Sequence, residues 1–451
     1  MPQEMRMFLV RLKQLKNFFL EDAIFFSVVA FCILLPFQFA LNPRAGFDVA
    51  VVRLLIPLLF FSWLFLKIKA KQTILINTKL TCLIFAFLLL ALFSISFSQN
   101  VFWSLRKFFF FLSIFPIYFV SLSVFNSAKK KRLVIFSLVI GGAMLSLIAI
   151  IQFVLQFIFG IDAVYAFLAN NVSSFFLGNS FSKSVLTYPS WLVSAGGSTY
   201  MRAVAMFPDP HMLSYYLEML IPWSIALWAL AKKQRGWLLV SAVFLIIADV
   251  LTFTRGSYVA LIAGAMIILP LVTKKTVSKI LLGAGLFALL LLLAPHNPVA
   301  DRFASSFDVQ EGSNQGRLNN WQQALEIISA HPFGVGIGSY SLSVKPTATY
   351  REPIYAHNTY LDVAAELGII TMLVFVAIVF FALKSFWIMS KTDPFFIAGV
   401  SSVAIFATHS LVENPLYSVH VLPLLLIILA LSASRALKPT QNIYEKNIDL
   451  E

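Results

Sequence analysis

Long apolar runs alternate with short polar segments along the whole chain. An α-helix rises about 1.5 Å per residue, so a run of about 20 residues crosses the ~30 Å hydrocarbon core of a membrane. Short alternating segments, which a membrane β-barrel would need, are not seen. The pattern predicts an all-α polytopic membrane protein with about twelve transmembrane helices, near residues 23–41, 49–66, 80–97, 106–125, 133–158, 211–230, 236–253, 257–272, 278–294, 358–383, 395–412 and 418–434.

Composition supports this fold class, because only 12% of the residues are charged and 59% are hydrophobic. A soluble domain carries about 25% charged residues. The two cysteines, Cys32 and Cys82, fall inside apolar runs and are expected to be packing residues rather than a disulfide or a metal pair. The first apolar run has no clear small-x-small cleavage site, which favours a retained first helix over a cleaved signal peptide.

Positive charge is distributed unequally between the two sets of loops. Of the 34 lysines and arginines, 23 fall on one predicted side and 18 of these are lysine, whereas the other side has 11, of which 8 are arginine. Positive loops stay in the cytoplasm, so both termini are predicted to be cytoplasmic. The net charge of +14 therefore encodes topology, and no nucleic-acid partner is expected.

The opposite, outer side collects arginine and histidine. A planar guanidinium grips phosphate or carboxylate at two points, which lysine does not do. This arrangement predicts an anionic, membrane-borne substrate at the outer face, although any single arginine could instead pair with a carboxylate or a lipid head group. The residues concerned are His211, His296, His331, His357, His409, His420, Arg44, Arg53, Arg106, Arg202, Arg255, Arg302, Arg317 and Arg351.

Two outer segments, 159–210 and 296–357, are too long to be simple turns, and the chain is otherwise expected to form one membrane domain over residues 1–451. The first segment is expected to contain a helix on the membrane surface, at 163–168 or 191–193. The second is expected to be partly helical over 316–328. The residues of the second segment that carry these expectations are Trp321, Ala324, Leu325 and Ile328 on one helix face, His331-Pro332 as the stop, and Gly334, Gly336 and Gly338 where the backbone approaches a neighbour closely.

His357 is the strongest candidate for chemistry. It lies where the second outer segment enters the tenth predicted span, with Asp362 about one turn inside that span and Glu366 four residues later on the same face. An imidazole accepts a proton near physiological pH with little tuning. The alternative is that His357 only caps the helix or packs at the interface.

Four motifs together resemble the O-antigen ligase and O-antigen polymerase superfamily of bacterial inner-membrane proteins. The resemblance covers roughly residues 200–420, and the first five spans match only in hydropathy. The motifs are His357-Asn358 followed by Gly368 and Thr371; Arg317, Trp321, His331-Pro332 and Gly334-Val335-Gly336; Thr254-Arg255-Gly256; and Arg202 with Phe207-Pro208-Asp209-Pro210-His211. Members of the superfamily often have Asn at the last of these positions, which puts a role for His211 in doubt.

The resemblance implies transfer of a glycan from a polyprenyl (undecaprenyl) pyrophosphate donor to an acceptor hydroxyl on the periplasmic side of the inner membrane. By this analogy His357 is the general base, and Arg255, Arg317 and Arg202 bind the pyrophosphate. The acceptor would be the lipid A core for a ligase, another carrier-linked repeat for a polymerase, or a protein for an oligosaccharyltransferase. The ending in Gly368 and Thr371 favours the ligase.

The chemistry needed is an activated hydroxyl and stabilisation of the departing diphosphate. Attack opposite the leaving group would invert the anomeric configuration. No Asp-x-Asp pair is present to bridge a metal and a phosphate, so the reaction is expected to need neither metal nor cofactor. Asp209 and His211 are the nearest approach to a metal pair.

Asn358, His409, Glu413 and Arg106 are expected to support the site. His409 and Glu413, spaced i, i+4 at the end of the eleventh span, are predicted to hold each other or a neighbouring loop. Arg106 and Lys107 begin the fourth span and are expected to meet pyrophosphate or lipid head groups. Two carboxylates within apolar runs, Glu218 and Asp249, need partners, for which arginines are available.

A flippase or transporter of lipid-linked glycans is the alternative from another class. Ion-coupled transporters place ionisable groups near the membrane midplane in broken helices. No acidic residue of this chain lies clearly at mid-depth, and the prolines within the spans have no charged neighbours. A structural scaffold would not need histidines and arginines gathered at one face. The sequence therefore favours the enzyme.

Overall fold

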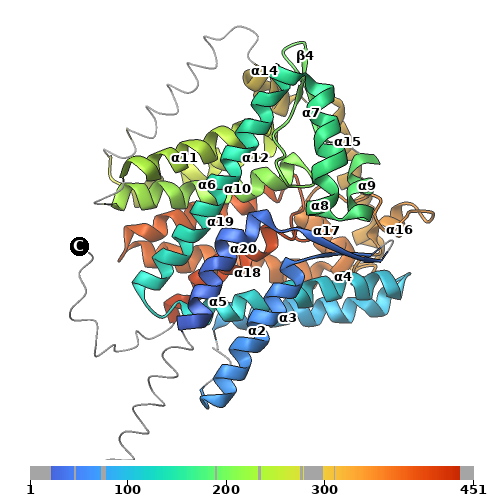
Figure 1. The fold of residues 1–451 in the computed structure, drawn as a ribbon. Coiled ribbons are helices and arrows are strands. Elements are labelled where there is room, and N and C mark those ends of the chain that lie inside the picture. The colour runs from blue at the N-terminus through green and yellow to red at the C-terminus, as the bar shows by residue number, and fades with distance from the viewer. Residues whose placement is uncertain are drawn as a thin grey trace, which may run out of the picture.

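The computed structural model describes residues 22–44, 47–72, 78–187, 190–231, 235–274, 278, 298–308 and 310–436. Figure 1 shows a bundle of helices, with α15 and the short helices α7, α8, α9 and α16 gathered at one end of it. The helices of the first half are Asp22–Phe37, α2 (Val52–Lys69), α3 (Lys79–Ser94), α4 (Val101–Ile114), α5 (Pro116–Val124), α6 (Ala128–Phe159), α7 (Ile161–Phe167), α8 (Ser173–Leu177) and α9 (Asn179–Thr187). The helices of the second half are α10 (Pro210–Leu230), α11 (Arg235–Val250), α12 (Arg255–Ile267), α14 (Pro298–Ala304), α15 (Gly312–Ala330), α16 (Tyr340–Val344), α17 (Thr359–Leu367), α18 (Ile369–Ser390), α19 (Ile397–His409) and α20 (Val421–Ala433).

Helices occupy eleven of the twelve predicted spans, and the span near 278–294 lies outside the described residues except for its first residue. Among the described residues, five helices are long and apolar enough to cross a membrane: Lys79–Phe97, Val101–Val124, Ala128–Phe159, Pro210–Leu230 and Ile369–Ser390. A helical membrane protein is therefore supported, whereas twelve crossings and their orientation stay predictions.

The centre of the bundle is formed by α10 and α20. Every residue of α20 is buried, and α10 buries Tyr215, Tyr216 and Trp223 completely. The neighbouring helices α12 and α19 pack closely because α12 has glycines where they meet. A Cβ on Gly256 would lie 2.6 Å from the ring of His409, and one on Gly264 would clash with Ile405. Small residues at such contacts let helix backbones approach each other.

The tenth predicted span is divided into two helices. Gly368, with φ of 92°, ends α17 and begins α18. A side chain there would meet the backbone of Phe333 at 2.7 Å, and Gly334 packs equally closely against the backbone of Glu366. The apolar run of α18 therefore begins at Ile369 rather than at residue 358, and α17 is a separate short helix that places Asp362 and Glu366 beside the candidate site.

Two short antiparallel hairpins interrupt the helical fold. The first pairs β1 (Ala40–Arg44) with β2 (Phe47–Ala50). The second pairs β3 (Leu192–Ala195) with β4 (Ser198–Met201) through Gly196-Gly197, whose φ values are 58° and 76°. Glycine pairs favour this two-residue turn because both positions need positive φ. Of the expected helix at 163–168, residues 163–167 lie in α7, and its place on the membrane surface stays a prediction, whereas a helix at 191–193 is wrong, because β3 begins at Leu192.

The second outer segment is partly helical, as predicted. Its helix α15 ends at Ala330, and Gly334, Gly336 and Gly338 all have positive φ of 83–94°. The buried face of α15 contains Ala324, Ile327 and Ile328, whereas Leu325 is 55% exposed and lies outside it. Because α15 packs on α17, this face holds the loop that precedes His357.

Candidate active site

A cavity of about 640 Å³ lies beside α4, α10 and α17 and is lined by charged and aromatic side chains. His357 is in its wall, and so are Arg106, Glu413 and His211. Arg202, Arg255 and Arg317 are not part of this lining. The structure therefore brings the predicted base and two of its supporting residues into one cavity and leaves the three predicted pyrophosphate ligands outside its wall.

His357 is paired with a buried carboxylate. Its Nδ1 lies 3.2 Å from Oε2 of Glu413, whose side chain is only 4% exposed, and its ring lies 4.1 Å from the ring of Tyr355. The backbone φ of His357 is 53°, which is uncommon for a residue with a side chain. Such backbone strain typically costs about 1–3 kcal/mol and persists only where the surroundings enforce it.

Three contacts around the start of α17 enforce this geometry. The side chain of Asn358 caps α17 by accepting hydrogen bonds from the amides of Tyr360 and Leu361, so its predicted supporting role is a helix cap. Thr359 donates its hydroxyl to the carbonyl of Glu413, and its amide donates to the carbonyl of Ser410. The loop with Glu413 is thereby tied to the helix that follows His357.

Burial and pairing shift the pKa values of both partners. Burial alone lowers the pKa of His357, but the Glu413 carboxylate outweighs it, so the pKa of His357 is raised above 6.5. Burial alone raises the pKa of Glu413, but His357, His211 and Arg317 hold it well below its usual range. Glu413 is therefore an anion that fixes a proton on Nδ1 and leaves Nε2 of neutral His357 to accept one.

Glu413→Gln is predicted to move the acidic limb of the pH profile of kcat/KM to lower pH. A general base acts in its neutral form, and removing the Glu413 charge lowers the pKa of His357, so the imidazole loses its proton at lower pH. The plateau rate should fall, because a glutamine can also orient Nδ1 as an acceptor, which gives the wrong tautomer. Glu326→Gln, an exposed change on α15, is the control; an acidic limb at the same pH in Glu413→Gln would exclude the pair from the mechanism.

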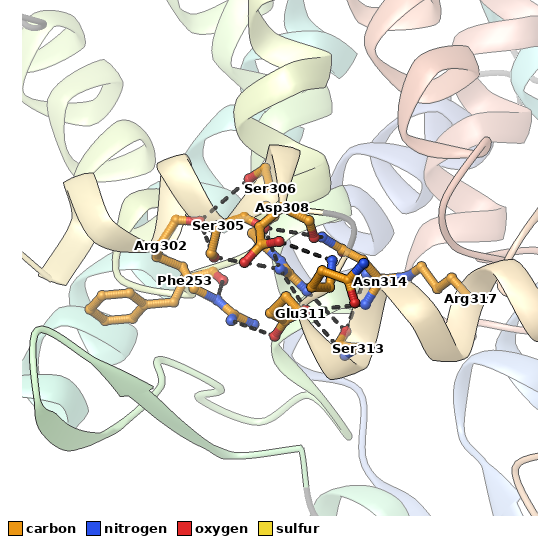
Figure 2. A network of polar contacts seen from close by, with 11 residues as sticks. Phe253, Arg302, Ser305, Ser306, Asp308, Glu311, Ser313, Asn314 and Arg317 are labelled. Atoms are coloured by element: carbon orange, nitrogen blue, oxygen red, sulfur yellow. Dashed lines mark hydrogen bonds and ion pairs between the residues drawn. The ribbon is translucent and has the colours of Figure 1, made fainter.

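Arg255 and Arg317 both bond Ser313 at the start of α15. Figure 2 shows Arg302, Glu311, Ser313 and Arg317 around this point. The hydroxyl of Ser313 accepts from Nη2 of Arg255 at 2.9 Å and from Nη1 of Arg317 at 3.4 Å. Glu311 lies 2.9 Å from Nη1 of Arg255 and 3.7 Å from Nη1 of Arg302. We call Arg255, Arg302 and Arg317 the α15 arginine cluster.

The α15 arginine cluster has more positive charge than its single carboxylate balances. Glu311 is its only acidic partner within salt-bridge distance among the described residues. Nε of Arg317 is buried with no hydrogen-bond partner among the described residues. The charge of Arg317 also lowers the pKa of both His357 and Glu413. The cluster therefore has positive charge and, within the described part of the chain, a free donor to offer an anion.

Arg202 has a different place. Its side chain is buried and donates to the carbonyl of Thr252 at 2.6 Å, the carbonyl of Ser190 at 3.1 Å and the hydroxyl of Thr254 at 3.1 Å. Burial, with the nearby charge of Arg302, lowers its pKa to about 9. Each of its three nitrogens donates one hydrogen bond to the protein, so Arg202 joins the end of the β4 strand to the start of α12.

Arg202→Gln is predicted to lower the thermal stability of the protein. Removal of a charged donor from buried carbonyls leaves them unsatisfied, which costs about 1–3 kcal/mol for each such group. A fluorescence melting curve of the purified protein measures this loss. The exposed Arg235→Gln, whose Nε bonds only the carbonyl of Ala231, is the matched control; equal melting temperatures for both variants would contradict this role.

The predicted pairing of His409 with Glu413 is wrong. The helix α19 ends at His409, so the i, i+4 spacing does not continue to Glu413. His409 instead lies 2.7 Å from Glu218 on α10 and stacks on Tyr215 at 3.9 Å. It is a core residue that joins α10 to α19.

The two carboxylates within apolar runs have partners, but these are not arginines. Glu218 pairs with His409, and Asp249 accepts hydrogen bonds from the hydroxyls of Ser214 and Ser257. Neutral hydroxyls satisfy a buried carboxylate without bringing a second charge into the core. The expectation of arginine partners is therefore wrong.

The partners of two cavity carboxylates, Asp362 and Glu366, were not predicted from the sequence. Asp362 binds the amide of Ala356 and the side-chain amide of Asn414, and Glu366 binds Lys107 and Tyr417. Burial raises the pKa of Asp362 to about 7. The spacing of Asp362 and Glu366 indicated a shared face, but nothing in the sequence indicated their partners.

The fold and the site define a helical membrane protein with a polar cavity at one end of its bundle. The O-antigen ligase family model matches residues 240–376, a range that contains Arg255, Arg317 and His357. An O-antigen polymerase of Salmonella muenchen is 27% identical over 187 residues, which are 39% of this chain and 44% of that protein. The chain spans less than half the length of this relative, and the two matches support the resemblance to the O-antigen ligase and polymerase superfamily.

Proposed function

We propose that this protein transfers a glycan from a polyprenyl pyrophosphate to an acceptor hydroxyl in the cavity that His357 lines. The observation that carries the proposal is the pair of His357 and Glu413 in the cavity wall, with the positive charge of Arg317 acting on both. A base, an anionic partner that orients it and a cationic group for the leaving diphosphate are the parts that the displacement needs.

The reaction is a single displacement. Nε2 of His357 takes the proton of the acceptor hydroxyl, and the oxygen forms a bond to the anomeric carbon of the donor sugar. The bond from that carbon to the pyrophosphate oxygen breaks, and the diphosphate leaves with the electron pair. Attack from the face opposite the leaving group inverts the anomeric configuration. No metal takes part in these steps.

Arg317 is the better placed of the two diphosphate ligands. Its buried Nε has no partner among the described residues, whereas Arg255 already engages Glu311, Ser305 and Ser313. Arg255 therefore reaches the diphosphate when Glu311 gives way, and Arg302 adds charge behind it. Negative charge that develops on the leaving oxygen is stabilised by such preorganised groups.

The acceptor separates a ligase from a polymerase. The family match favours a ligase, which would use the lipid A core, and the Salmonella relative is named a polymerase, which favours a second carrier-linked glycan. Transfer to a protein hydroxyl uses the same base and the same leaving group. The ligase is our first choice because the motifs of residues 357–371 and the matched family agree.

Reconstitution into proteoliposomes with a polyprenyl-pyrophosphate glycan tests this function. Acceptors are offered one at a time: lipid A core, a second lipid-linked glycan and a peptide. Release of polyprenyl pyrophosphate with product formation, unchanged by a chelator, is the expected result. Movement of the intact donor between leaflets without bond cleavage would refute the enzyme and establish the flippase.

A further inference from the structure

Several of the charges that line the cavity are balanced by an oppositely charged neighbour, whereas the carboxylates of Asp209 and Asp362 accept hydrogen bonds from amides. Glu366 pairs with Lys107 at 2.8 Å, and Glu413 pairs with His357. Glu352 pairs with Lys345, and Arg351 pairs with Asp48 at 3.0 Å. Asp48 also accepts hydrogen bonds from the backbone amides of Ser180 and Phe181, so both of its oxygens are engaged.

Among the lysines and arginines that line the cavity, Arg53 on α2 and Arg106 on α4 have no such partner, and we call them the α2–α4 arginine pair. Both line the cavity, and no carboxylate of a described residue lies within salt-bridge distance of either. Nε of Arg53 donates to Ser113 at 3.1 Å, and its guanidinium lies over the ring of Phe110. The guanidinium of Arg106 lies 4.2 Å from the ring centre of Tyr350.

This arrangement concentrates like charge. The charge of Arg106 acts unfavourably on both Arg53 and Arg351, and of these three guanidiniums only that of Arg351 is paired with a carboxylate of the described residues, Asp48. The aromatic rings hold the side chains of the pair in place without neutralising them. A protein keeps like charges together in a partly buried cavity at a cost that a bound anion removes.

We infer that the α2–α4 arginine pair is a second anion subsite, which binds a phosphate or pyrophosphate group of the acceptor lipid. This inference rests on the proposed function for the identity of the acceptor. The pair belongs to α2 and α4, and the α15 arginine cluster belongs to α12, α14 and α15, which lie on another side of the molecule (Figure 1). Donor and acceptor anions are thus held apart, with His357 in the wall of the cavity that the acceptor enters.

An anionic acceptor explains why arginine occupies both positions. Planar guanidiniums grip phosphate oxygens in pairs and keep their charge when partly buried. A cavity of about 640 Å³ leaves room for a diphosphate together with a sugar, because drug-sized ligands occupy pockets of roughly 300–1,000 Å³. A neutral sugar acceptor would instead leave the two charges unbalanced.

Calorimetric titration of the purified full-length protein with inorganic pyrophosphate tests the subsite without requiring activity. We expect two binding events in the wild type, one in Arg53→Gln/Arg106→Gln and one in Arg255→Gln/Arg317→Gln. Arg132→Gln is the matched control, because Arg132 also lies over an aromatic ring, that of Phe395, but does not line the cavity. Two binding events in Arg53→Gln/Arg106→Gln would overturn the inference.

Kinetics and membrane composition distinguish the sources of the anion. In the reconstituted transfer assay, Arg53→Gln/Arg106→Gln should raise the acceptor KM about tenfold or more, as loss of charge-assisted hydrogen bonds does, with the donor KM unchanged. A raised donor KM with an unchanged acceptor KM would overturn the inference. The pyrophosphate titration can also be repeated in nanodiscs. If the second pyrophosphate-binding event is lost in phosphatidylglycerol but kept in phosphatidylcholine, lipid head groups occupy the arginine pair, and the inference is overturned.

The two proposals fail separately. A wild type that binds two pyrophosphates but transfers no glycan to any acceptor would refute the proposed function and support the second subsite. A wild type that binds one pyrophosphate, lost only in Arg255→Gln/Arg317→Gln, would overturn the second subsite and support the donor site.

Discussion

Replacing His357 with alanine is expected to abolish glycan transfer while the protein stays folded and inserted. Removal of a positioned general base typically costs about 10²–10⁴-fold in rate. The variant should also lose the imidazole charge that keeps Glu413 ionised, so the side chain of Glu413 becomes less ordered. Product formation in proteoliposomes, at equal amounts of inserted protein, measures the effect.

His331→Ala provides the control for this change. His331 is exposed at the end of α15 and does not line the cavity, so transfer should continue at the wild-type rate. The φ of 53° at His357 is as strained for alanine as for histidine. Asparagine tolerates this backbone conformation, so His357→Asn is the second variant. Transfer at the wild-type rate in both His357 variants would remove the imidazole from the mechanism.

Loss of Arg317 is expected to have the next largest effect. Arg317→Ala removes a cation that acts on His357 and Glu413 and, in the proposed function, contacts the leaving diphosphate. Removing one preorganised donor to developing negative charge costs about 10²–10³-fold in kcat. The fall should appear in kcat and in the donor kcat/KM, with the acceptor KM unaffected.

The matching lysine variant separates charge from geometry. Arg317→Lys keeps the charge but loses the planar fork, so it should recover only part of the activity. Arg132→Lys, at an ion pair with Asp393 away from the cavity, should be neutral. Full activity in Arg317→Lys would show that a point charge is sufficient and would contradict a two-point grip on the diphosphate.

Local sequence signals predicted the helices well. Apolar run length located α6, α10 and α18, because each such run must bury its backbone polar groups within itself. Punctuating residues were also informative, since Gly334 and Gly338 have positive φ where close backbone approach was expected. The break at Gly368 was not predicted, because the apolar pattern continues through it and only the contact with Phe333 requires it.

Pairings between distant segments could not be predicted from one sequence. Lys107 and Glu366 are 259 positions apart, and Arg351 and Asp48 are 303 apart, so no local spacing relates them. The pairing expected between His409 and Glu413 assumed that one helix contains both residues. It failed because α19 ends at His409. The partner that Glu413 does have, His357, depends on how α17 and α19 are packed together.

In the candidate site, too, the sequence predicted which residues lie together but not which of them have partners. The motifs brought together Arg255 and Arg317, which share Ser313, and identified Asn358 beside the base as a supporting residue, which caps α17. They did not reveal that Arg202 is occupied by backbone carbonyls, because satisfied and free arginines look alike in a sequence. Motif order therefore identified the neighbourhood, and packing determined which groups are available.

A structure of the protein with a bound polyprenyl-pyrophosphate glycan would show whether His357 and the arginines act together. We expect diphosphate oxygens within hydrogen-bond distance of Arg317 and Arg255, and an anomeric carbon whose open face is turned toward Nε2 of His357. A diphosphate held by Arg53 and Arg106, with the anomeric carbon turned away from His357, would contradict it.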